Sequence, residues 1–79
     1  MNNILWHNIK QKINLSGHTE DEIYCFTLII SCKGQNLWIV IKLKTISQVI
    51  LIEDILTKND YIITGLVVSF NDETSTQII

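Results

Sequence analysis

Two histidines and two cysteines are the residues of this chain best suited to metal binding or nucleophilic chemistry: His7, His18, Cys25 and Cys32. The seven-residue separation of Cys25 and Cys32 places them on opposite faces of an extended strand, so this spacing does not form a zinc site. Because the start Met1-Asn2-Asn3 lacks the basic flank of a signal peptide, both thiols are expected to be reduced and to fill core space. The sequence predicts no metal site and no catalytic cysteine.

Acidic residues occur as a run, Glu20-Asp21-Glu22, and as a neighbouring pair, Glu53-Asp54. Paired-carboxylate catalysis requires two groups that converge on one substrate. The run precedes a predicted strand as a solvated loop, and the pair points to opposite faces if its segment is extended. No glycine-rich phosphate motif, HExxH or CxxC spacing occurs. The sequence therefore predicts no catalytic residue and no cofactor, and the protein is not expected to be an enzyme.

The charge balance argues against nucleic acid as the main partner. Six lysines oppose eight acids, which gives a net charge of -2, and arginine is absent. Trp38, Lys42 and Lys44 would place a stacking ring beside two cations, as in proteins that bind single strands. The favoured interpretation is the rim of a protein interface or a solvated sheet face, so no direct RNA binding is predicted.

Length and hydropathy indicate one small domain. The chain has 79 residues, of which 47% are hydrophobic, enough for a single core. Its longest apolar runs fall far short of the roughly 20 residues of a membrane span, so no membrane association is predicted. We assign residues 1–71 to one domain and residues 72–79 to a polar tail, which is expected to fray although Ile78 and Ile79 are able to dock.

Alternating hydropathy predicts strands over Ile23–Cys32, Leu37–Lys44 and Tyr61–Phe70. Ile, Val and Thr make up 27 of the 79 residues, and their branched Cβ atoms favour a pleated sheet. The segment 33–36 predicts a hairpin turn, because Gly34 accepts a positive φ without steric cost. Gly65, inside the last strand, predicts a bend or bulge.

The segment 47–59 fits two structures. As a helix it would be capped by Ser47 and would carry an apolar stripe of Val49, Ile52, Ile55 and Leu56. As a strand it would use the β-branched run 49–52 and a hairpin loop at 58–60. The strand is preferred.

These elements together predict a mainly β fold, a small and strongly bent five-stranded antiparallel barrel or sheet with at most a short N-terminal helix. The helix follows from the spacing of Leu5, Ile9 and Ile13, and it is expected to run into a first strand. The alternative is an α+β fold with a helix at about 48–57. An open sheet of this size leaves two free edges, which small β domains close into a barrel or lend to a partner.

Two strings resemble the motifs of the Sm-like family. Residues 28–31 with 36–40 resemble the first Sm motif, in which Asn36 matches the family's Asn. Residues 61–68 resemble the second motif, where Gly65 matches its Gly and Thr64 stands in place of its Arg. Because the family's RNA-binding acid, stacking residue and Arg have no counterparts here, the resemblance implies no uridine pocket. The pattern is most similar to the divergent Sm-like Gemin subunits, the sixth and then the seventh, of the survival-of-motor-neuron complex.

The resemblance implies a non-catalytic subunit that forms a heterodimer with another Sm-like protein, within a cytoplasmic and nuclear complex that assembles spliceosomal snRNP cores. Edge strands would pair through main-chain hydrogen bonds. We place the pairing edges on the segments 49–55 and 61–70. The predicted interface residues are Val49, Leu51, Glu53, Ile55, Tyr61, Ile63, Gly65, Val67 and Phe70.

A second hypothesis comes from a different class of protein. A small acidic inhibitor or immunity-type protein would mask a basic enzyme or a nucleic-acid-binding surface. Its contact residues would be Glu20, Asp21, Glu22, Asp72 and Glu73. The dependence of the association rate on ionic strength distinguishes the two hypotheses. Association steered by charge slows at high ionic strength, whereas apolar strand pairing barely responds.

Overall fold

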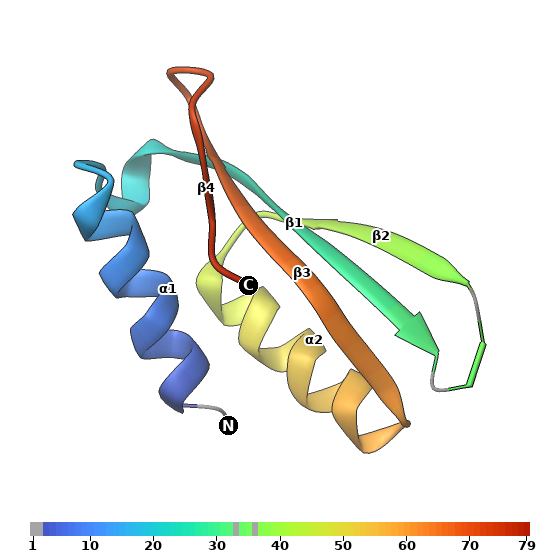
Figure 1. The fold of residues 1–79 in the computed structure, drawn as a ribbon. Coiled ribbons are helices and arrows are strands. Elements are labelled where there is room, and N and C mark those ends of the chain that lie inside the picture. Colours follow the sequence, from blue (N-terminus) through green and yellow to red (C-terminus); the bar gives the residue numbers. More distant parts are fainter. Residues whose placement is uncertain (1–2, 33, 36) are drawn as a thin grey trace.

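The chain forms an α+β domain, in which two helices pack on one face of an open, four-stranded antiparallel sheet (Figure 1). The computed structural model describes residues 3–32, 34–35 and 37–79. The elements are α1 (Asn3–Leu15), a short 3-10 helix η1 (Glu20–Glu22), β1 (Ile23–Cys32), β2 (Trp38–Leu43), α2 (Ile46–Lys58), β3 (Tyr61–Phe70) and β4 (Ser75–Gln77). In this described part of the chain, neither α1 nor α2 is long and apolar enough to cross a membrane.

The order of elements consists of two helix–strand–strand units, α1-β1-β2 and α2-β3-β4. The first strands of the two units, β1 and β3, have ten residues each and pair antiparallel in the centre of the sheet. The sheet order is β2-β1-β3-β4, so β2 and β4 form its edges. These edges are unequal, because β2 has six residues and β4 only three.

The hydrophobic core lies between the helices and one face of the sheet. Alternate residues of the central strands point into it and are at most 3% exposed: Phe26, Leu28, Ile30, Leu66, Val68 and Phe70. The helices contribute buried stripes of Leu5, Ile9, Ile13, Ile46, Val49 and Ile50. Because both helices bury their stripes on this face, the described elements leave the other face of the sheet uncovered.

The five strands of the predicted mainly β fold are not present among the described residues, and the alternative helix at about 48–57 is confirmed as α2. The helix is capped by Thr45 rather than by Ser47. The Thr45 hydroxyl accepts a hydrogen bond from the Gln48 backbone N–H (3.1 Å), and the Gln48 side chain accepts one from the Thr45 backbone N–H (3.3 Å). This capping box satisfies two otherwise unpaired donors at the start of the helix. Burial of Val49 and Ile50 in the core outweighs the strand propensity of the β-branched run.

The three strands predicted by alternation are confirmed, with β2 running from Trp38 to Leu43. Gly34 has a φ of 82°, as the hairpin prediction requires, while Lys33 and Asn36 lie outside the described residues. The bulge predicted at Gly65 is also confirmed, because the pairing of β1 with β3 shifts between Ile29↔Gly65 and Ile30↔Ile63. The N-terminal helix is confirmed as α1. The additional strand that this helix was expected to run into is not formed, because α1 is followed by η1 and then by β1.

The end of the chain lies against β3 and does not fray as expected, whereas the expected docking is confirmed for Ile78. Residues 75–77 form β4, and Ile78 packs against the core. Leu66 donates its backbone N–H to the Ile79 carbonyl (3.3 Å), and Ile78 donates to the Leu66 carbonyl (2.7 Å). The outer edge of β3 is therefore covered by the chain from Leu66 to Phe70.

Candidate interaction surface

The longest free edge in the described sheet belongs to β2. This strand pairs with β1 on one side, from Phe26↔Leu43 to Ser31↔Trp38, and no described strand lies on its other side. The backbone N–H and C=O groups on that side are available to a further strand.

Apolar side chains are exposed along this edge. Four consecutive residues have large exposed fractions: Leu37 61%, Trp38 66%, Ile39 42% and Val40 57%. The register places Trp38 and Val40 on the uncovered face of the sheet, while Ile39 lies on the face that the helices cover. Edge strands of soluble proteins are usually short or protected by charges, so a long apolar edge indicates a contact surface.

The two lysines of this region turn inward toward β1. Lys42 donates to the Thr27 hydroxyl (2.7 Å), and both residues lie on the uncovered face. Lys44 donates to the Tyr24 carbonyl (3.2 Å), and its Nζ lies 4.6 Å from the centre of the Tyr24 ring. Because both ammonium groups contact β1, they do not protect the outer edge of β2 from pairing with another strand, as lysines on edge strands usually do.

The structure does not bring the predicted interface residues together. Val49 and Glu53 are buried on α2, whereas Leu51 and Ile55 are exposed on the same helix. The strand edge expected over residues 49–55 is therefore not formed, because this segment is helical. A contact of these residues with a partner stays a prediction.

The remaining predicted residues lie on β3, which occupies the interior of the sheet along its second half. Phe70 is buried in the core, and Tyr61 and Ile63 pack against it. Gly65 is covered by Ile29, whose Cδ1 would lie 3.3 Å from an added Cβ, and Val67 pairs with strands on both sides.

Of the Sm-motif counterparts, Thr64 donates its hydroxyl to the Ile29 carbonyl (3.1 Å), and Asn36 lies outside the described residues. Sequence reasoning missed β2 as the edge, although its five consecutive apolar residues 37–41 were a signal.

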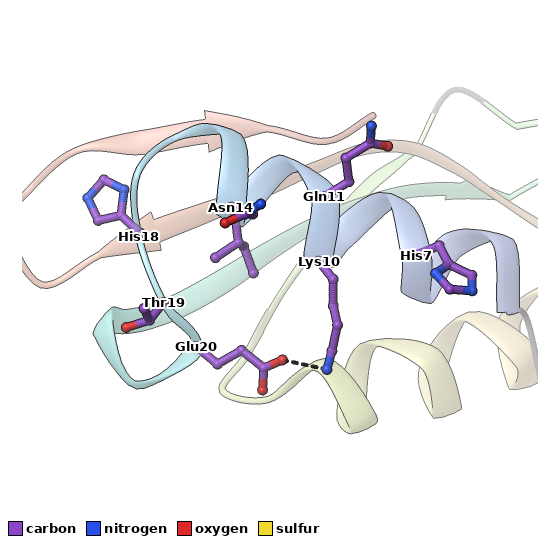
Figure 2. Close-up of a pocket in the computed structure, with 8 residues that line it drawn as sticks. His7, Lys10, Gln11, Asn14, His18, Thr19 and Glu20 are labelled. Atoms are coloured by element: carbon purple, nitrogen blue, oxygen red, sulfur yellow. Dashed lines mark ion pairs between the residues drawn. The ribbon is translucent and has the colours of Figure 1, made fainter.

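A separate pocket of about 540 Å³ lies along α1 (Figure 2). Its lining residues are His7, Lys10, Gln11, Ile13, Asn14, His18, Thr19 and Glu20. An ion pair of 2.9 Å joins Lys10 to Glu20, and the Lys10 ammonium also lies 4.2 Å from the centre of the Trp6 ring. The lysine charge is thus neutralised inside the pocket. Within the described ranges, no group of three or more His, Cys, Asp or Glu side chains is placed to hold a metal ion.

Ser16, His18 and Asp72 have the residue types of a hydrolase triad, but their hydrogen bonds differ from it. The His18 ring lies between the Ser16 hydroxyl (Nδ1 to Oγ, 3.1 Å) and the Asp72 carboxylate (Nε2 to Oδ2, 2.8 Å). Ser16 donates its hydroxyl proton to the Ile13 carbonyl (2.6 Å), so His18 is not placed to remove it. The ring stacks on Phe70 with centroids 3.8 Å apart. This cluster joins the end of α1 to the turn between β3 and β4.

The cluster predicts a dependence of stability on pH. The hydrogen bond to Asp72 raises the pKa of His18 above 6.5, so its stabilising effect is complete below about pH 6.5 and is lost as the pH rises through the raised pKa. Hydrogen bonds from Thr74 and then from His18 lower the pKa of Asp72 from 3.8 to about 2. The stabilising effect of the Asp72 carboxylate is therefore complete above pH 3.8 and is lost as the pH falls through about 2. We expect the contribution of this cluster to the free energy of unfolding to be greatest between about pH 3.8 and about pH 6.5.

The pH prediction is checked by urea unfolding at about pH 5.5 and about pH 8.5. Wild type should be more stable at the lower pH, and His18→Gln should remove most of this difference. His7→Gln, an exposed histidine on α1, is the matched control and should retain it. An unchanged difference in His18→Gln would show that other groups cause the dependence.

The acidic residues of the second hypothesis, the acidic inhibitor, lie at the end of the molecule that holds the His18–Asp72 cluster. Residues 20–22 form η1, and Asp72 and Glu73 lie in the β3–β4 turn. The two segments are joined by a hydrogen bond from the Asn71 backbone N–H to the Glu22 carbonyl (2.9 Å). Trp38 pairs with Ser31, eight residues along β1 from Ile23, so Trp38 lies about 26 Å along the strand from this acidic end.

The fold and the surface define a small α+β domain with an exposed apolar sheet edge along β2. Comparison with known proteins found no match to this chain among family models, curated proteins or solved structures. The Sm-like resemblance therefore stays a prediction.

Proposed function

We propose that this protein is a non-catalytic interaction module that binds another protein chain by strand addition to the free edge of β2. The observation that carries the proposal is the run of four exposed apolar residues, 37–40, beside an unpaired strand edge. In strand addition, main-chain hydrogen bonds supply affinity, and the alternating side chains select the partner.

The energetics favour such a contact. Burial of the exposed parts of Trp38 and Val40 contributes on the order of 4 kcal/mol, at about 25 cal/mol per Å² of apolar surface. The strand is held by its six-residue pairing with β1, so little conformational entropy is lost when a partner binds.

The finer form of the proposal is that the partner is another Sm-like protein, in a heterodimer within a complex that assembles spliceosomal snRNP cores. Its support is the resemblance around Thr64 and Gly65. Since residues 46–58 form α2, the pairing edge in this proposal moves from the segment 49–55 to β2.

The test compares two lysine substitutions on the uncovered face. Val40→Lys adds a charge at the free edge of β2, whereas Ile62→Lys adds one on the first half of β3, where the side chain is similarly exposed (48%) but lies on the far side of β1 from the β2 edge. We expect Val40→Lys to reduce partner capture in native cells at least tenfold, because the added charge must be desolvated, and Ile62→Lys to have little effect. Quantitative cross-linking and mass spectrometry provide the measurement.

The outcomes of this test separate the two forms of the proposal. Sm-like proteins among the partners that depend on Val40 would support the finer form. Equal loss with both variants, or no loss with either, would contradict binding through the β2 edge.

The gathering of acids at the η1 end favours a second candidate function, the masking of a basic enzyme or nucleic-acid-binding surface. Asp21 and Glu73 are both exposed there. A partner bound in this way should associate roughly tenfold more slowly at high salt, and the double substitution Asp21→Lys/Glu73→Lys should have a similar effect. Association that is insensitive to salt and depends on Val40 would exclude this candidate.

A further inference from the structure

We propose that the chain which occupies the β2 edge is a second copy of this protein, so that two sheets join across a two-fold axis into one continuous antiparallel sheet. The inference rests on the proposed function of β2 and names its partner.

The sequence of β2 is complementary to itself in one antiparallel register. Residues directly opposite each other in an antiparallel pair project from the same face of the sheet. An axis through Val40 places Trp38 opposite Lys42 of the second copy on the uncovered face, and it places Ile39 opposite Ile41 of the second copy on the other face. The Trp–Lys pair occurs twice in the dimer, and each Lys42 would exchange its hydrogen bond to Thr27 for a cation–π contact with Trp38 of the other copy.

The neighbouring register with its axis at Ile41, which also preserves the faces, is less favourable. An axis through Ile41 places Lys42 opposite Val40, so a charge faces an apolar side chain. The axis through Val40 is therefore preferred to the axis through Ile41, because it places each Lys42 opposite an aromatic ring.

The distribution of charge permits two copies to approach. No acidic residue occurs between Glu22 and Glu53 in the sequence, a range that contains β1, the hairpin and β2. The acids of the η1 end lie about 26 Å along β1 from Trp38, so the like charges of two copies do not meet across the β2 edge.

The geometry favours a closed dimer rather than a fibre. Pairing of β2 with β2 uses the same surface on both copies, and the interface is closed by the two-fold axis. The opposite edge differs in sequence: β4 has three polar residues, Ser75–Gln77, and beyond β4 only residues 61–65 of β3 lack a described neighbouring strand on this side.

The buried area indicates a weak dimer. The exposed parts of residues 37–40, together with the strand backbone, amount to on the order of 500 Å² per copy. About 1000 Å² in total is near the lower limit for a specific interface, so we expect a dissociation constant in the micromolar range.

Sedimentation equilibrium from about 1 µM to about 1 mM tests the affinity. Wild type should change from monomer to dimer across this range. Val40→Lys places like charges opposite each other at the axis and should raise the dissociation constant at least tenfold. Ile62→Lys should leave it within twofold, and circular dichroism should show that both variants fold.

Disulfide cross-linking tests the register. All variants carry Cys32→Ser, and Cys25 is buried (8% exposed), so the introduced thiol is the reactive one. Val40→Cys should form a covalent dimer on mild oxidation. Trp38→Cys and Lys42→Cys should not do so separately, but an equimolar mixture of the two should form a mixed dimer.

The results distinguish this inference from the proposed function. A chain that stays monomeric to about 1 mM, with no Val40→Cys dimer, would overturn the second copy as partner. The proposed function would survive that result if Val40→Lys still prevented capture of a different chain, and it would fail if capture were unaffected. Equal cross-linking of all three single variants would also overturn the inference, because it would exclude a two-fold axis at Val40.

Discussion

Phe26→Ala is expected to lower the free energy of unfolding by about 3–5 kcal/mol, the range for removal of a fully buried aromatic side chain. Phe26 is 0% exposed and lies in the central strand, opposite Leu43 of β2 and Val68 of β3. The cavity would therefore affect the packing of both neighbouring strands. A chain of this length has a total stability of only about 4–12 kcal/mol, so the variant should be largely unfolded under mild denaturing conditions.

Urea unfolding of Phe26→Ala and Tyr24→Ala checks this expectation. Tyr24 is the matched control, an aromatic residue on the same strand that is 59% exposed and contacts Lys44. Its substitution should cost less than about 1 kcal/mol. A small effect at Phe26, or equal losses for the two variants, would contradict the position of the core. We also expect faster amide exchange in β2 of Phe26→Ala, which would link the core to the proposed interaction edge.

Val49→Ala should destabilise the protein much more than Leu51→Ala. Val49 is 0% exposed on the inner face of α2, and Leu51 is 60% exposed on its outer face. Loss of the buried valine methyl groups with incomplete collapse of the cavity costs about 2–3 kcal/mol. Truncation of the exposed leucine should cost about 0.5 kcal/mol or less.

This pair of variants discriminates between a helix and a strand in the segment 46–58. In a strand, Val49 and Leu51 would project from the same face, and the two alanine substitutions would have similar effects. Chemical denaturation of both variants gives the answer, and equal losses would contradict the helical assignment.

Local patterns were sufficient to predict much of the fold. The alternation in β1, β2 and β3 identified the strands because burial on one face of a sheet imposes a period of two. Gly34 and Gly65 marked the hairpin and the bulge, and the spacing of Leu5, Ile9 and Ile13 marked α1. Each of these signals depends on neighbours within a few residues.

The same reasoning failed for α2. The β-branched run 49–52 favours a strand locally, and the helix forms because Ile46, Val49 and Ile50 fill the space above the central strands. That space is created by β1 and β3, which are distant in the sequence, so tertiary burial decided against local propensity.

The candidate site was likewise predictable only in part from local sequence patterns. The sequence alone determined that residues 37–44 form an apolar strand and that acids flank both ends of the β1–β3 region. Only the tertiary structure decided that β2 is an edge, that β3 is covered from Leu66 onward, and that His18 meets Asp72. The physical reason is that strand order and contacts between distant segments result from packing of the whole core, whereas alternation and turn chemistry are encoded in each segment separately.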